Sequence, residues 1–270
     1  MSTLASTRVP AQTRSVLLDL GEEAAREKSL DLPAQWNLTA FERATAIAFW
    51  RTRMVQEHVS ARVFASLIAQ MMKAGIRAEY QAAVGDMVTQ EFRHARLCAT
   101  VIHALGGEAV APVLALPDVP THDDVSPLEA VLRNVLSISC ISETTAVAEF
   151  AFERECLWPG PIRDMQKEIL ADEVNHARFG WRLVDELSPQ LCGSVRKGLS
   201  EYLVYALRQR FERALEQRAS LAATPRLAAI GGADGEQNFE LFLQTIHEVV
   251  LPGLEACGLR ARQAWASVVQ

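Results

Sequence analysis

Several features that mark secreted, zinc-binding or membrane-spanning proteins are missing from this 270-residue sequence. Its five cysteines are odd in number, widely scattered and without a CxxC pair, which indicates neither a disulfide framework nor a zinc site. No apolar run approaches the roughly 18 residues of a membrane span. The first residues, MSTLASTRVPAQTRSVLLDLGEE, lack the apolar core of a signal peptide. We therefore expect a reduced, cytoplasmic protein with no membrane partner.

The balance of charge and hydrophobicity narrows the class further. A net charge of −6 disfavours nucleic acid or an anionic membrane as the main partner. Hydrophobic residues make up 49% of the chain, which is enough for a sizeable core and is not typical of disorder.

Alternation of the strand type is essentially absent, and helical periodicity takes its place. Glycine and proline interrupt the helical pattern at Gly75, at Gly106–Gly107 and in the WPGP stretch of residues 158–161. The segment 108–127 contains four prolines and little periodicity, which is typical of a long connection. The pattern predicts helices over about 41–74, 77–105, 126–157, 161–187, 194–222 and 237–269.

Two helical hairpins joined by a long connection predict an all-α four-helix bundle with a crossover between helices two and three. We expect a partly disordered leader over residues 1–38 and one domain over residues 39–270. In that domain the bundle covers residues 41–187, and two accessory helices within residues 194–269 cover one side.

One motif occurs once in each predicted hairpin. EFRHARL contains Glu91 and His94, and EVNHARF contains Glu173 and His176. Residues three apart on a helix lie on the same side, so each pair can bind one metal ion. A single such pair would carry no weight because chance can produce it, whereas two copies, both followed by Ala-Arg and both on an apolar stripe, favour a site. The alternative is a set of ion pairs on a buried face.

The other two bundle helices each carry a glutamate on their apolar stripe, namely Glu57 and Glu143. Glu149 and Glu153 are alternatives to Glu143. In antiparallel hairpins these residues return to the height of the repeated motif, so four carboxylates and two imidazoles would meet. Burying four ionised carboxylates is very unfavourable, but two divalent cations would neutralise them. Oxygen-rich ligation with one imidazole per ion suits iron or manganese better than zinc.

The stretches QEHVSARVF, QEFRHARL, CISETTA and DEVNHARF resemble the metal-bearing helices of the ferritin-like, non-haem di-iron carboxylate proteins. The resemblance covers roughly residues 41–187. It implies two Fe ions, with Mn/Fe or Mn/Mn pairs using the same ligands. It implies Glu57 and His94 on one ion, Glu143 and His176 on the other, and Glu91 and Glu173 as bridges. Asp172 matches the aspartate that often orients a ligand histidine, and Gln90 occupies the equivalent place in the first repeat.

Departures from the family pattern exclude some of its members. Cys98 stands where ribonucleotide-reductase-like proteins have a radical tyrosine, so a tyrosyl radical is disfavoured. Met87 and Ile169 stand where arylamine N-oxygenases carry a further histidine. Rubrerythrins add a CxxC iron domain that this chain lacks. Whether His247 or Cys98 reaches the site is open from the sequence.

The resemblance implies an O₂-dependent oxidase or oxygenase that acts on a small organic substrate, with an electron donor as a further partner and a homodimer as a compatible assembly. The alternative is a ferritin- or bacterioferritin-like ferroxidase, or another iron-handling or peroxide-scavenging protein. A third reading is an interaction module that has lost its activity, which retention of all six ligand types disfavours. The sequence leaves the substrate open.

Overall fold

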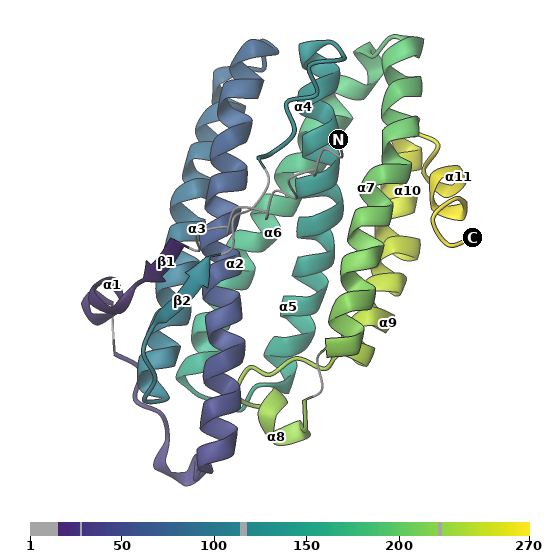
Figure 1. Cartoon of the computed structure of the whole chain (residues 1–270). Coiled ribbons are helices and arrows are strands. Elements are labelled where there is room, and N and C mark those ends of the chain that lie inside the picture. The colour runs from purple at the N-terminus through teal and green to yellow at the C-terminus, as the bar shows by residue number, and fades with distance from the viewer. Residues whose placement is uncertain (1–15, 28, 114–117, 221–222) are drawn as a thin grey trace, which may run out of the picture.

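The computed structural model describes residues 16–27, 29–113, 118–220 and 223–270. Long, roughly parallel helices dominate this part of the chain (Figure 1). The prediction of an all-α bundle is therefore confirmed.

The first hairpin consists of α2 (Ala40–Lys73) and α3 (Ala78–Ala104), which pack along their length. A capping box begins α2, because the Thr39 hydroxyl accepts from the Glu42 N–H and the Glu42 carboxylate accepts from the Thr39 N–H. Gly75 adopts a φ of 68° in the turn between the two helices, where a side chain would be strained.

The second hairpin pairs a three-part helix with α6 (Pro161–Leu187). Its first helix is continuous but changes geometry, from α4 (Pro127–Val135) through the π-helical segment η2 (Leu136–Glu143) to α5 (Thr144–Cys156). The sequence predicts one regular helix here, and the wide π turn ends at Glu143. Pro161 is in the first turn of α6, where its missing N–H costs no helical hydrogen bond.

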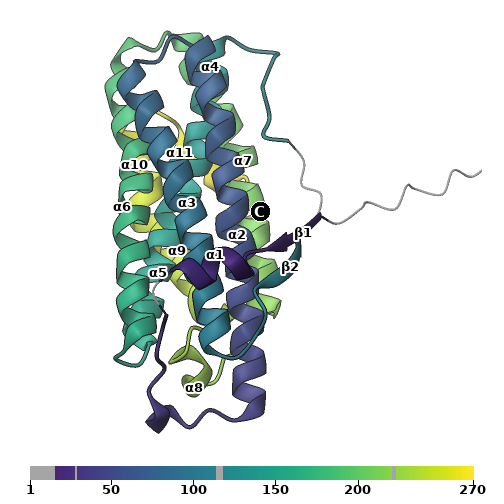
Figure 2. The same ribbon diagram turned by 90° about the vertical axis from the view of Figure 1, so that its left-hand side faces the viewer.

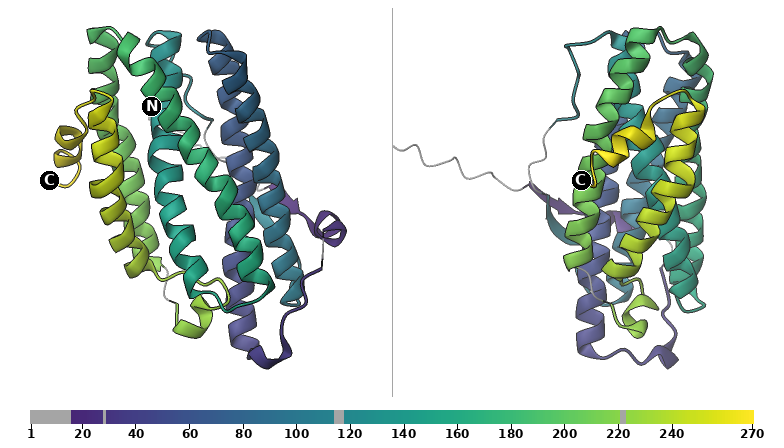
Figure 3. Two further views of the ribbon diagram at one scale, coloured as in Figure 1. Left: turned by 180° about the vertical axis from the view of Figure 1, so that it is seen from behind. Right: turned by 90° about the vertical axis from the view of Figure 1, so that its right-hand side faces the viewer.

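The remaining helices cover the side of the bundle formed by η2 and α5 (Figure 3). The last of the predicted helices, 237–269, is in fact divided into several shorter helices. These accessory elements are η3 (Ser188–Gln190), α7 (Gly193–Ser220), α8 (Pro225–Ala228), α9 (Gly235–Thr245), the π-helical η4 (Ile246–Val250), α10 (Leu251–Ala256) and α11 (Ala261–Ala266).

A small ribbon lies across the outside of the first hairpin (Figure 2). Strand β1 (Val16–Asp19) pairs antiparallel with β2 (Val110–Val113), and α1 (Gly21–Arg26) packs against α3. The short 3₁₀ turn η1 (Ala34–Trp36) follows. Of the leader predicted over residues 1–38, residues 1–15 and 28 lie outside the described part. Leu18, Ala24 and Trp36 are buried in the core, so this region of the leader is packed.

Two apolar clusters fill the bundle, one toward each end, and every bundle helix contributes to both. On α2, Met54 belongs to one cluster and Phe64 to the other. On α6, Ile169 and Phe179 divide in the same way. The residues between these pairs are the predicted ligands, so a polar layer separates two apolar cores.

The helix Pro127–Cys156 is long and apolar enough to cross a membrane by length and composition alone. It packs against α6, α7 and α9 in this fold, and a core helix passes the same test.

Candidate metal centre

The polar layer brings together the six residues that the sequence singles out. They come from all four bundle helices: Glu57 from α2, Glu91 and His94 from α3, Glu143 from the end of η2, and Glu173 and His176 from α6. All six are buried. The two histidines, Glu91 and Glu173 are at most 2% exposed, whereas Glu57 and Glu143 are 6% and 9% exposed.

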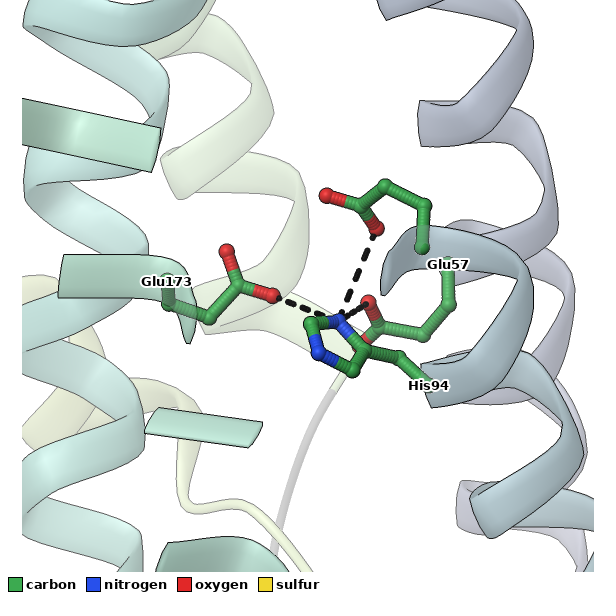
Figure 4. A group of neighbouring side chains, drawn as sticks. Glu57, His94 and Glu173 are labelled. Carbon is green, nitrogen blue, oxygen red and sulfur yellow. Dashed lines mark ion pairs between the residues drawn. The ribbon is translucent and has the colours of Figure 1, made fainter. Parts of the chain in front are cut away.

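The first group of potential ligands surrounds His94 (Figure 4). The His94 Nδ1 atom lies 3.1 Å from Glu173 Oε1, 3.6 Å from Glu57 Oε2 and 3.9 Å from Glu91 Oε2. One potential donor atom from each of these four residues falls within 4.8 Å of the others. This spacing is compatible with one shared cation.

The second group repeats the arrangement around His176. Its Nδ1 atom lies 3.1 Å from Glu91 Oε1 and 3.2 Å from Glu173 Oε2. Donor atoms of Glu143, Glu173 and His176 fall within 4.8 Å of one another. Glu173 belongs to both groups, and Glu91 directs one oxygen toward each histidine, as expected of two bridging carboxylates.

The unpaired atoms at the centre test whether a metal fits. Within the described residues, His94 Nδ1, His176 Nδ1 and Glu91 Oε2 are buried and have no hydrogen-bond partner. Each histidine nitrogen faces two or more carboxylates. Buried polar atoms normally find partners, so three orphaned atoms at one place indicate a missing component. Divalent cations would occupy these positions and would neutralise the four carboxylates.

The pKa values in the metal-free cluster are shifted because several carboxylates and two imidazoles are buried close together. Burial, together with the neighbouring Glu173, raises the pKa of both Glu91 and Glu143 well above the ordinary range. Burial alone would lower the pKa of His94, but Glu173 and Glu57 raise it to about 11. Protons thus compensate charge where cations are absent, and metal binding would displace them.

An outer chain of hydrogen bonds fixes both imidazole rings. His94 Nε2 lies 3.1 Å from Asp172 Oδ2, and His176 Nε2 lies 2.9 Å from Gln90 Oε1. The Gln90 amide also donates to Asp172 Oδ1 at 3.3 Å. If each Nε2 carries the proton, each Nδ1 presents a lone pair to the centre. Each histidine is therefore oriented by a residue of the opposite hairpin.

The alternatives left open by the sequence occupy other positions. Glu149 pairs with Arg210 at 2.6 Å, and Glu153 pairs with Arg53 at 2.5 Å, so an arginine compensates the charge of each carboxylate. His247 is exposed and packs on Trp265, with ring centroids 5.8 Å apart.

Cys98 is fully buried within the core cluster that contains Met54. Burial and then the negative charge of Glu57 raise the pKa of its thiol, so Cys98 lies near the centre as a neutral thiol. It belongs to neither of the two ligand groups.

Close packing of α6 against η2 positions Glu143. A Cβ atom at Gly180, one turn after His176, would lie 2.4 Å from Ser139 Cβ and 3.1 Å from Cys140 Sγ. Trp181 supports the same contact, since its indole N–H donates to the Thr144 hydroxyl at 2.9 Å. The packing role of Gly180 becomes visible only when η2 is seen against it.

Two cavities lie along the helices that carry the six residues, and His176 lines one of them. One of about 540 Å³ lies between α2, η2 and α7, and its walls include Gln56 and Ser142, the residues immediately before Glu57 and Glu143. The other, of about 810 Å³, opens between α3 and α6 and is lined by Gln90, His176 and many charged side chains.

Comparison with known proteins yields a likeness among solved structures. No protein-family model and no curated protein matches the chain. Among solved structures, the chain is similar to one described as "Protein 19 with aldehyde deformylating oxidase activity from Synechococcus", with a TM-score of 0.59 and 18% sequence identity. The alignment covers 86% of this chain and 97% of that one. The likeness extends beyond the four-helix bundle, and this chain therefore has an all-α, ferritin-like helical-bundle fold.

Proposed function

We propose that this protein is an O₂-dependent non-haem di-iron oxidase or oxygenase that acts on a small organic molecule. The observation that carries the proposal is the pair of buried, orphaned histidine Nδ1 atoms, each facing carboxylates of a cluster with four glutamates. The activity named for the structural neighbour supports the same class of chemistry.

The protein's own residues divide the work at the centre. Two bound iron ions would supply the redox chemistry with O₂. Glu91 and Glu173 would hold both ions together, while Glu57 and Glu143 would each close one end. Asp172 and Gln90 hold the Nε2 protons and thereby keep the Nδ1 atoms directed inward. The apolar cores on both sides exclude water from the reaction.

We further propose that the organic substrate approaches from the cavity between α2, η2 and α7. Glu57 and Glu143 are the most exposed of the six residues, and their preceding neighbours line this cavity. Its volume of about 540 Å³ lies in the range typical of small-molecule sites. A cytoplasmic location, an electron donor and a homodimer complete the proposal.

Metal content and reactivity with O₂ provide the test. Protein purified without oxygen and supplied with Fe(II) is expected to retain about two iron ions per chain, as the ligand set of this bundle class requires. Mixing with O₂ should then give a transient visible absorption band. The variants E91A and E173A should lose most of the iron, whereas E168A, an exposed position on α6, should retain it.

Full iron content in E91A and E173A would refute the site. Oxidation of Fe(II) without oxidation of any organic compound, in a particle of many hundreds of kilodaltons, would favour iron handling instead.

A further inference from the structure

The two metal positions differ in their outer hydrogen-bond partners, and we propose that this difference makes the protein bind its two ions in order, first at His94 and then at His176. Gln90 and Asp172 act as positioning residues that set this order. The inference rests on the metal centre of the proposed function.

The six inner residues give little reason for the two positions to differ in metal affinity. Each position has one histidine three residues after a bridging glutamate, one terminal glutamate from the other helix of its hairpin, and a share of both bridges. All six side chains are buried. An asymmetry must therefore come from outside this set.

The outer partners are chemically unequal. His94 donates its Nε2 proton to a carboxylate, Asp172, whereas His176 donates to a neutral amide, Gln90. A carboxylate acceptor increases the basicity of the imidazole and strengthens its bond to a metal ion. It also adds a negative charge near the first position, where the cation is attracted.

The surroundings of Asp172 leave most of this effect in place. Arg93 approaches Asp172 Oδ2 to 3.8 Å, but its other guanidinium nitrogen contacts Glu168, and the Arg93 side chain is 38% exposed. The Gln90 amide donates to the other oxygen of Asp172. Gln90 therefore links the two histidines, yet only His94 has a charged outer partner at its Nε2 atom.

The size of the expected difference in metal affinity follows from the usual effect of outer hydrogen-bond partners on ligand histidines. Loss of an outer-shell hydrogen bond typically weakens metal binding by about 10- to 100-fold. We expect the His94 position to bind a divalent ion tighter than the His176 position by a factor of this order. A chain with one ion, held by Glu57, His94 and the two bridges, should accumulate at substoichiometric metal.

Titration of the full-length, metal-free protein with Mn(II) tests the order, with free Mn(II) measured by its electron paramagnetic resonance signal. Two binding steps are expected. E57Q should abolish the tighter step and E143Q the weaker one. D172N should weaken the tighter step by about 10- to 100-fold and leave the other nearly unchanged, and Q90L should do the reverse.

The matched control is N175A. Asn175 precedes His176 in the sequence and lines the same cavity as Gln90, but its amide donates to the Ala171 carbonyl. This variant should keep both steps. A general loss of structure would weaken both steps together, so the selectivity of D172N and Q90L separates positioning from folding.

The other possible outcomes would count against either the proposed binding order or the metal centre itself. Two equal sites in the unmodified protein, a tighter step that survives in E57Q, or equal effects of D172N on both steps would overturn the proposed order. Absence of any Mn(II) or Fe(II) binding would instead refute the metal centre itself.

Discussion

At the scale of single residues, the six side chains that meet in the polar layer could be selected from the sequence because chemistry and periodicity coincide there. Glutamate and histidine rarely occur on an apolar stripe, and the repeat marks them twice. Their outer partners are a different case. That Asp172 faces His94, and Gln90 faces His176, depends on how two distant hairpins dock, and local spacing does not encode this.

Gly180 offers a test of the close packing that positions Glu143. In G180A the new methyl group would overlap Ser139, and relief of such overpacking costs about 1–3 kcal/mol of folding free energy. We expect urea unfolding to show this loss. The control is G85A in α3, where a Cβ atom meets nothing within 4 Å. That variant should gain about 0.5–1 kcal/mol, because alanine favours a helix over glycine. An undiminished stability of G180A would argue against tight contact of α6 with η2.

At the scale of elements, caps and breaks in the sequence predicted the four long helices closely, while the π-helical segment was not predicted. The wide turn of η2 shifts the phase of the apolar stripe between α4 and α5, which a regular α-helical pattern does not anticipate. A π turn contains one more residue than an α turn but has the same kind of apolar composition, so the sequence carries no clear signal of it. The β1–β2 ribbon was missed for a similar reason, since each strand has only four residues.

The start of α2 should make a pH-dependent contribution to stability. Hydrogen bonds from Arg226 and from the Thr39 N–H lower the pKa of Glu42 to about 2. A lowered carboxyl pKa stabilises the fold fully above the ordinary value of 4.5 and loses this effect as the pH falls toward 2. E42Q should therefore be less stable than the unmodified protein at pH 6, and the difference should shrink below pH 4.5. Chemical unfolding of both proteins between pH 3 and 7 measures it; a constant difference would contradict the ion pair.

At the scale of the whole molecule, the proposed metal centre would lie in the polar layer between two apolar cores, and stability would then depend on metal. Binding to the folded state alone adds about 2.7 kcal/mol per site when the free ion is at 100 times its Kd. We expect chelation with EDTA to lower the melting temperature of the metal-loaded protein. The double variant E91A/E173A should be insensitive to EDTA. A melting temperature unchanged by chelation in the unmodified protein would mean that the layer is stable without cations.

The crossed pairing of His94 with Asp172 and of His176 with Gln90 also has a kinetic consequence. Neither hairpin contains an oriented imidazole together with its outer partner, and the proposed centre would use both bridging glutamates at each position. A single folded hairpin is therefore a poor ligand, and the full site forms only after the two hairpins dock. Bound ions then act after the transition state for docking, so they slow the separation of the hairpins without speeding their encounter. The metal centre would thus determine the lifetime of the folded protein more than the rate at which it forms.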